Sequence, residues 1–239
     1  DTVGQSLEGR NMYRLEITDT ESPHPRSDRW VHYFANQHPG EHNSEWRLVG
    51  MVDWMLSEEA ASFRERNIAY VVVMMSPDAP SNGWYRTNQE GVDMNRSYRP
   101  EGPDKEEQAH EAYLWQRDFA AIMDSEAPVT TAWAIHTWQG RVEPIVRTGP
   151  EMGGTLGPWT DFRDAMDEAD TQDLIETLSR TEGPPGYGAV SWSAGPHEQY
   201  GITGVLCEGG GNFYTKQENI DSGEYLMRSI DAYYVGARE

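Results

Sequence analysis

The chain has 239 residues and a mass of 27.1 kDa, which is enough for one large domain with a substantial buried core. Its formal net charge of -21 argues against nucleic acids and anionic membranes as partners, because both require basic patches on the protein surface. The single cysteine, Cys207, excludes an internal disulfide and a cysteine-based zinc site. No apolar run of roughly 18 residues or more occurs, so no segment is expected to span a bilayer.

The acidic balance has two interpretations that the sequence leaves open. Only Lys105 and Lys216 are lysines, and the other basic residues are arginines. An acidic, lysine-poor surface suits a protein adapted to high salt, where screening removes self-repulsion. An acidic protein from a GC-rich genome would have the same composition. Neither interpretation identifies a compartment, and the localisation stays open.

In chain order, short apolar strands alternate with longer amphipathic helices. The strands are expected over residues 13–18, 31–36, 69–75, 130–136 and 201–208, and the helices over 43–66, 104–125, 161–180 and 219–237. This alternation predicts an α/β fold with a mixed, mostly parallel β-sheet flanked by helices on both faces.

We expect a single domain over residues 1–239, because no linker joins two halves of different composition. The first strand begins almost at the N-terminus. An N-terminal part of the full protein, such as a signal, a pro-segment or a β domain, could therefore be absent from this chain.

Three of the strong strands are followed by residues that can bind a metal. His38 and Glu41 follow the strand 31–36, and His136 ends the strand 130–136. In α/β sheets ligands bind at the carboxyl ends of the strands. Two histidines and one glutamate with an open fourth position form a catalytic zinc set, and Glu208 after the last strand could act as a general base. Each residue alone is as well explained by an ordinary polar loop or a capped strand end.

Several motifs in this order resemble those of the zinc metallocarboxypeptidases, which have the carboxypeptidase A-like fold. They are HPGE at 38–41, SPDAPSNGWYRTNQEGVDMNRSYR at 76–99, AIHTWQG at 134–140 and Glu208 at a strand end. The opening segment 3–19 also resembles the first strand-turn-strand of that family. The HPGE form is closest to the cytosolic-carboxypeptidase-like branch.

The resemblance implies a metal site. His38, Glu41 and His136 match the zinc ligands, for one Zn²⁺ per chain, and Asp93 matches a residue that orients a ligating imidazole.

The resemblance also implies catalytic and binding roles. Glu208 matches the general base that takes a proton from a zinc-activated water. Arg86 matches the arginine that stabilises the developing negative charge on the carbonyl oxygen. Asn95 and Arg96 match the pair that grips the terminal carboxylate of the substrate.

Three features depart from the family pattern or stay open. Tyr187 is the best match to the mobile tyrosine of the family, and Tyr200 is a second candidate. SPDA at 76–79 replaces the usual NPDG. The residue that sets the preference for the last side chain of the substrate is not identified; Val190, Trp192 and Ser193 lie in the corresponding region, which contains no cationic residue.

The implied activity is hydrolysis of the C-terminal peptide bond of peptides or proteins by a zinc metallopeptidase, with a peptide or protein C-terminus as the partner. Alternatives on the same fold are a zinc-dependent deacylase or amidase of N-acyl amino acids or murein peptides, and a catalytically inactive binding protein. The oligomeric state is not indicated.

Overall fold

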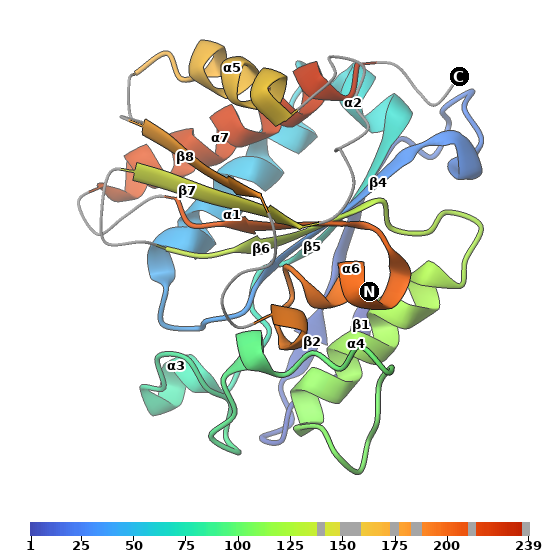
Figure 1. The fold of residues 1–239 in the computed structure, drawn as a ribbon, viewed down its shortest axis with the longest axis vertical. Helices are drawn as coiled ribbons and strands as arrows, with labels where there is room; N and C mark the ends of the chain where they lie inside the picture. The colour runs from blue at the N-terminus through green and yellow to red at the C-terminus, as the bar shows by residue number, and fades with distance from the viewer. Residues whose placement is uncertain (138–141, 149–158, 173–176, 183–187, 210–213, 236–239) are drawn as a thin grey trace.

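The structure is a computed structural model that describes residues 1–137, 142–148, 159–172, 177–182, 188–209 and 214–235. Within these residues a seven-stranded sheet forms the centre of the molecule (Figure 1). Its strands lie in the order β3 (Leu15–Ile17), β5 (Asn67–Val72), β4 (Trp30–Asn36), β6 (Thr131–Ile135), β9 (Thr203–Cys207), β7 (Val142–Thr148) and β8 (Thr177–Glu182).

The sheet is mixed and mostly parallel, as the sequence predicts. Strands β5, β4, β6 and β9 run parallel to one another, and β7 pairs in parallel with β8. The antiparallel pairs are β3 with β5 and β7 with β9. A separate hairpin, β1 (Thr2–Gln5) with β2 (Asn11–Tyr13), precedes the sheet.

Helices cover both faces of the sheet (Figure 1). One face carries α1 (His42–Leu56), α5 (Trp159–Ala169) and α7 (Lys216–Tyr233), and the other carries α4 (His110–Met123) and α6 (Gly195–Tyr200). The shorter elements are α2 (Ala61–Arg66), α3 (Ala79–Asn82) and the 3-10 turns η1 (Arg26–Asp28), η2 (Met94–Arg96) and η3 (Gly188–Val190). None of the helices in the described part of the chain is long and apolar enough to cross a membrane.

Each face of the sheet has its own apolar core. Phe34 and Trp133 pack toward α1 and α7, whereas Tyr33 and Ala35 of the same strand β4 pack toward α4. Because both faces are covered, β4, β5 and β6 are almost continuously buried, which explains their unbroken apolar sequences.

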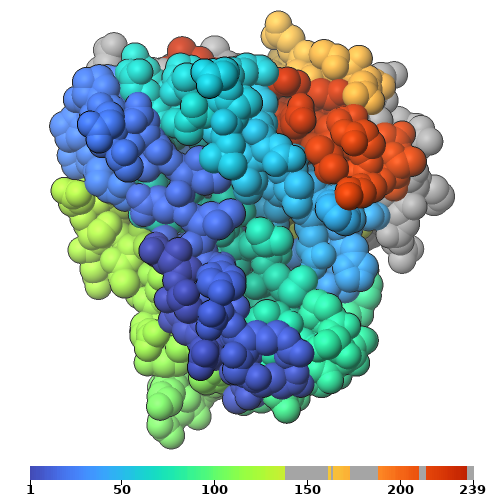
Figure 2. Space-filling view, turned by 180° about the vertical axis from the view of Figure 1, so that it is seen from behind, coloured from blue at the N-terminus to red at the C-terminus, as the bar shows by residue number. Residues whose placement is uncertain are grey.

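The N-terminal hairpin lies on the surface beside the segment that follows β5. The space-filling view from behind shows the first residues against that segment and α4 (Figure 2). Ser6 Oγ donates to Asp78 Oδ1 at 2.6 Å, and the backbone N–H of Leu7 donates to Glu111 at 3.2 Å. These bonds join the start of the chain to the SPDA turn and to α4.

The five predicted strands are present, but all four helix predictions need correction, the last one only in its bounds. The predicted helix 43–66 is two helices, because α1 ends at Leu56 and the chain is extended at Ser57. The Arg64 side chain donates to the carbonyls of Met55 and Ser57, both at 2.6 Å, and thereby closes the end of α1. The predicted helix 104–125 begins only at His110, because Asp104 forms a turn with the N–H of Glu106 at 2.9 Å.

The third correction concerns residues 161–180, where the helix α5 ends at Ala169 and residues 177–180 belong to strand β8. Strand β7 was not predicted, because RVEPIVRT contains a proline and charged residues rather than an apolar run. The two strands pair with each other in parallel, a long-range contact that local sequence patterns do not reveal. The last helix begins earlier than predicted, at Lys216, after a capping box formed by Thr215 and Glu218.

Two glycines allow α1 and α7 to pack in close contact. A Cβ atom on Gly50 would lie 2.0 Å from the carbonyl oxygen of Ile220, and one on Gly223 would lie 2.1 Å from the carbonyl oxygen of Arg47. Since both obstacles are backbone atoms, neither can rotate away. The helices must separate if either position gains a side chain.

We therefore expect Gly50→Ala to lower the free energy of unfolding by about 1–3 kcal/mol, despite the better helix propensity of alanine. Urea unfolding followed by circular dichroism measures the change. Asp53→Ala, on the exposed face of the same helix, is the matched control. A Gly50→Ala protein as stable as this control would contradict the close packing.

Candidate active site

The carboxyl ends of three neighbouring parallel strands bring the predicted metal-binding residues together. Asn36 at the end of β4 pairs with Ile135 of β6, and Ile135 pairs with Cys207 of β9. The backbone N–H of His136 donates to the carbonyl of Cys207 at 2.8 Å. Residues that follow these strands therefore lie at the same edge of the sheet.

His38, Glu41 and His136 form a compact buried group at this edge. The Nδ1 atom of His38 lies 2.7 Å from Glu41 Oε1, and the Nδ1 atom of His136 lies 3.0 Å from Glu41 Oε2. One potential ligand atom from each residue lies within 4.8 Å of the others. The side chains are almost completely buried, with exposed fractions of 2%, 5% and 1%.

The second nitrogen of each imidazole also has a partner. His38 Nε2 lies 2.9 Å from Asp93 Oδ1, and His136 Nε2 lies 3.1 Å from Asn95 Nδ2. Asp93 Oδ1 also accepts the backbone N–H of Asn95 at 2.9 Å, which fixes the start of η2. Asn95 Oδ1 accepts the N–H of Trp192 at 3.0 Å. Asp93 and Asn95 therefore fix the orientation of the two imidazole rings.

The electrostatics keep both carboxylates charged. Burial alone would raise the pKa of Glu41, but the hydrogen bonds and charges of His136 and His38 outweigh it and hold that pKa well below its usual value. Burial also opposes ionisation of Asp93, yet His38 and Arg86 lower the pKa of Asp93 far below the usual range.

The two histidines differ in their surroundings. Burial lowers the pKa of His38, but the hydrogen bonds to Asp93 and Glu41 more than compensate, so that its pKa is raised. Burial dominates at His136, and its pKa is lowered despite the bond to Glu41. The neutral imidazole is thus favoured at His136.

The group fits a zinc ion chemically. Two imidazole nitrogens and one carboxylate are ligands that zinc uses in catalytic sites, where three protein ligands leave room for a further group. Asp93 accepts a hydrogen bond from His38 Nε2 and so leaves the Nδ1 lone pair on the side of Glu41 and His136. This carboxylate–histidine arrangement commonly orients zinc ligands.

The two arginines differ in their contacts with this group. Arg86 donates to Asp93 Oδ2 from Nε at 3.1 Å and forms an ion pair with the same oxygen from Nη2 at 3.0 Å. Its Nη1 atom lies 3.7 Å from Glu41 Oε1. Arg96 is exposed and donates from Nη1 to the carbonyl of Asn95 at 2.9 Å.

Glu208 and the two candidate tyrosines are the remaining predicted site residues. Glu208 is half-buried at the end of β9. Burial, together with the charges of Glu41 and Glu208, raises the pKa of Tyr85, although Arg86 opposes this effect. Tyr187 lies outside the described residues, and Tyr200 packs beside Phe119 with ring centroids 6.0 Å apart.

The sequence analysis missed two contributors to the site. The backbone N–H of Thr137 donates to Glu41 Oε2 at 3.0 Å, a contact that side-chain motifs cannot reveal. The N–H of Gly40 donates to the carbonyl of Tyr85 at 2.8 Å and joins the HPGE loop to the segment that carries Arg86. The only sequence signal for this contact is the glycine within HPGE.

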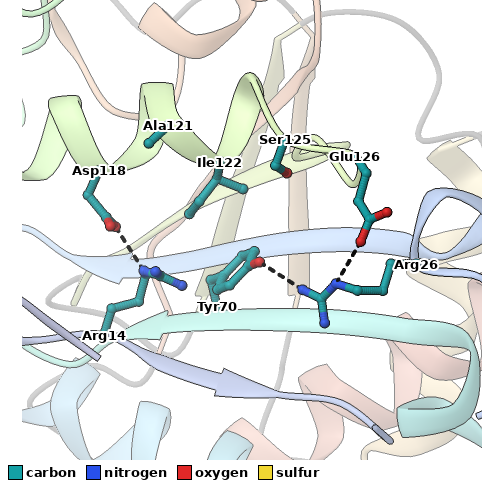
Figure 3. A pocket seen from close by; sticks show the side chains of 8 residues that line it. All are labelled: Arg14, Arg26, Tyr70, Asp118, Ala121, Ile122, Ser125 and Glu126. Atoms are coloured by element: carbon teal, nitrogen blue, oxygen red, sulfur yellow. Dashed lines mark hydrogen bonds and ion pairs between the residues drawn. The ribbon is translucent and has the colours of Figure 1, made fainter. Parts of the chain in front are cut away.

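A cavity of about 250 Å³ lies away from the His38, Glu41 and His136 group, between β5 and the end of α4 (Figure 3). Its arginines are engaged with acidic residues: Arg14 Nε donates to Asp118 at 2.8 Å and Arg26 Nη1 donates to Glu16 at 2.9 Å. The two guanidinium groups point toward Tyr70 from opposite sides (Figure 3). We interpret the charged side chains around this cavity as an ion-pair network that joins the sheet to α4.

Sequence comparison identifies the family. The zinc carboxypeptidase family matches residues 1–147, more than half of the chain, and the chain belongs to this family. Cytosolic carboxypeptidase 2 from Danio rerio is 37% identical over 99 residues, which cover 40% of this chain and 14% of that protein. Cytosolic carboxypeptidase 1 from Homo sapiens is 34% identical over 113 residues, which cover 44% of this chain and 9% of that protein.

Solved structures have the same fold. A metallo-carboxypeptidase from Burkholderia cenocepacia superimposes with a TM-score of 0.74 at 20% identity, covering 98% of this chain and 63% of that chain. A metallo-carboxypeptidase from Pseudomonas aeruginosa, in complex with (2-guanidinoethylmercapto)succinic acid, has a TM-score of 0.71 at 20% identity, covering 96% of this chain and 62% of that chain. The chain therefore spans a small part of the curated relatives and less than two thirds of these structures.

Zinc should stabilise the folded protein, because it binds the assembled group and not the unfolded chain. Loss of a residue that hydrogen-bonds to a zinc ligand typically lowers zinc affinity by roughly 10–100-fold. We expect Glu41→Gln, which changes a ligand itself, to lower the affinity by more than this. Competition with a chromophoric chelator measures the affinity, and the melting temperature with and without zinc gives a second readout. Glu45→Gln, one turn further along α1, is the control, and equal zinc affinity of the two variants would rule out Glu41 as a ligand.

Proposed function

We propose that residues 1–239 form the catalytic domain of a zinc-dependent carboxypeptidase that hydrolyses the C-terminal peptide bond of peptides or proteins. The single observation that carries this proposal is the buried group His38, Glu41 and His136 at the sheet edge, in a chain of the zinc carboxypeptidase family. The partner is accordingly a peptide or protein C-terminus.

We assign one Zn²⁺ per chain to these three residues. When bound, zinc supplies Lewis-acid chemistry, which polarises a carbonyl group and makes a water molecule more acidic. The protein contributes the negative charge of Glu41, and Asp93 orients His38 through Nε2.

Glu208 is assigned as the general base. Its place at the end of β9, next to the strand that presents His136, supports this role. The carboxylate would take a proton from the attacking water and deliver it to the leaving amine, so that the same group serves both steps.

Arg86 is assigned to stabilise the negative charge that develops on the carbonyl oxygen. Asp93 holds its guanidinium group by two nitrogens, and Nη1 lies 3.7 Å from Glu41, so the cation is fixed beside the metal ligands. A donor that is already oriented costs little reorganisation when the charge appears.

Asn95 and Arg96 are assigned to the terminal carboxylate of the substrate. Asn95 is 1% exposed and lies between His136 and Trp192, whereas Arg96 is exposed beside it. A planar guanidinium binds a carboxylate through two hydrogen bonds, which would align the last peptide bond with the metal. Tyr187, which matches the mobile tyrosine of the family by sequence position, is proposed as a further catalytic residue.

Replacing the proposed base tests the chemistry separately from the metal site. We expect Glu208→Gln to lower kcat by roughly 100-fold to 10,000-fold while zinc content is retained, because proton transfer is lost but no ligand is removed. Release of the C-terminal amino acid from peptides, with and without a chelator, is the assay. Glu198→Gln, an exposed glutamate on α6, is the control. Full activity of the Glu208→Gln enzyme would refute the assignment.

Recognition of the terminal carboxylate of the substrate can be tested with paired substrates. We expect Arg96→Gln to lower kcat/KM for peptides with a free C-terminus by about 10- to 150-fold, since a hydrogen bond to a charged group contributes about 1.5–3 kcal/mol. C-terminally amidated peptides should show no such difference between wild type and variant. Arg99→Gln, three residues further along the same segment, is the control. An equal loss on acids and amides would contradict carboxylate recognition.

A further inference from the structure

A small apolar cavity adjoins the HPGE loop. It has a volume of about 150 Å³ and lies between this loop and the segment after α3. Its walls include Pro39, Gly40, His42, Pro80, Trp84 and Tyr85. None of the described residues that line the cavity is acidic, although the chain has 40 acidic residues. The cavity therefore differs in chemistry from the acidic surface expected of this chain.

The walls of the cavity are held in place by backbone contacts. The N–H of Gly40 donates to the carbonyl of Tyr85 at 2.8 Å, and the N–H of Trp84 donates to the carbonyl of Ala79 at 3.1 Å. A Cβ atom on Gly40 would lie 2.3 Å from Cδ2 of Tyr85 and 2.7 Å from its Cα, so a glycine is needed for this approach. The Tyr85 ring is thus fixed over the loop that carries His38 and Glu41.

The burial of the site residues indicates where a bound peptide would leave the site. Asn95 and His136 are each 1% exposed, whereas the Arg86 side chain is 43% exposed and Tyr85 is 55% exposed. A terminal carboxylate that reaches Asn95 would lie at the buried end of the site, with Arg96 exposed beside it. The rest of the peptide must then leave over the exposed rim, where Arg86 and Tyr85 lie.

We propose that this cavity is an accessory substrate subsite, which takes an apolar side chain from the part of the peptide that precedes the bond to be cut. This inference rests on the proposed function. Tyr85 and Trp84 offer aromatic surface, and the prolines offer rigid apolar walls, so an aliphatic or aromatic side chain removes apolar surface from water on binding. The carbonyl of Tyr85 accepts the N–H of Gly40, so Tyr85 lies next to the loop that carries His38 and Glu41.

The test compares two acetylated peptides with the same final residue, acetyl-Leu-Leu-Leu-Ala and acetyl-Gly-Gly-Gly-Ala. We expect wild-type kcat/KM to favour the leucine peptide by about 10-fold or more, within the roughly 10–200-fold range of apolar pockets. Tyr85→Ala and Trp84→Ala should each bring this ratio toward one. Tyr85→Phe keeps the ring and should keep the ratio. Tyr13→Ala removes a tyrosine that is 59% exposed on β2 and is the matched control.

The outcomes separate the subsite from the proposed function. If both peptides are cleaved with zinc dependence but Tyr85→Ala and Trp84→Ala keep the wild-type ratio, the subsite is wrong and the proposed function stands. If neither peptide is cleaved, the proposed function fails. The subsite is then decided by the affinities of the two peptides for zinc-loaded Glu208→Gln protein, measured by calorimetry with and without Tyr85→Ala. Equal affinities for both peptides would overturn it.

Discussion

The burial of the Glu41 carboxylate is the constraint on which the site depends. A buried charge is costly unless hydrogen bonds and opposite charges compensate for the lost water. Here two imidazoles and the N–H of Thr137 surround the carboxylate, and Arg86 lies at its open side. These groups come from three parts of the chain: the HPGE loop, residues 136–137 and Arg86. The charge can be accommodated only when β4, β6 and the segment 86–95 are all in place.

The outer partners extend this constraint across the molecule. Asp93 joins His38 to Arg86, and Asn95 joins His136 to the segment before α6. The Gly40–Tyr85 contact adds a backbone link between the same two regions. As a result, the loops are positioned by hydrogen bonds among themselves as well as by the sheet. Such support is needed when a site must hold its geometry while one face stays open to a substrate.

The sequence allowed the inner sheet and the proximity of His38, Glu41 and His136 to be predicted for related physical reasons. Strands covered on both faces have unbroken apolar sequences, and their polar ends stand out: His38 and Glu41 follow one such strand and His136 ends another. Strands β7 and β8 lack such sequences and depend on pairing with each other, so they escaped detection. The break in the helix 43–66 depends on Arg64 reaching back to Met55 and Ser57, which a periodic pattern does not encode. Tyr85 was not predicted, because its contact is with Gly40, which lies far earlier in the chain.

The acidity of the chain bears on how an anionic substrate terminus would reach the site. A net charge of -21 repels a carboxylate at long range, whereas Arg86 and Arg96 attract it only nearby. Salt shortens the range of the repulsion, from about 10 Å at 0.1 M to about 3 Å at 1 M, but screens a partly buried contact much less. High salt would therefore lower the barrier to approach and screen the exposed Arg96, while weakening the contact with the half-buried Arg86 less. An acidic surface is thus compatible with carboxylate recognition, and most compatible in the saline surroundings that one interpretation of its composition predicts.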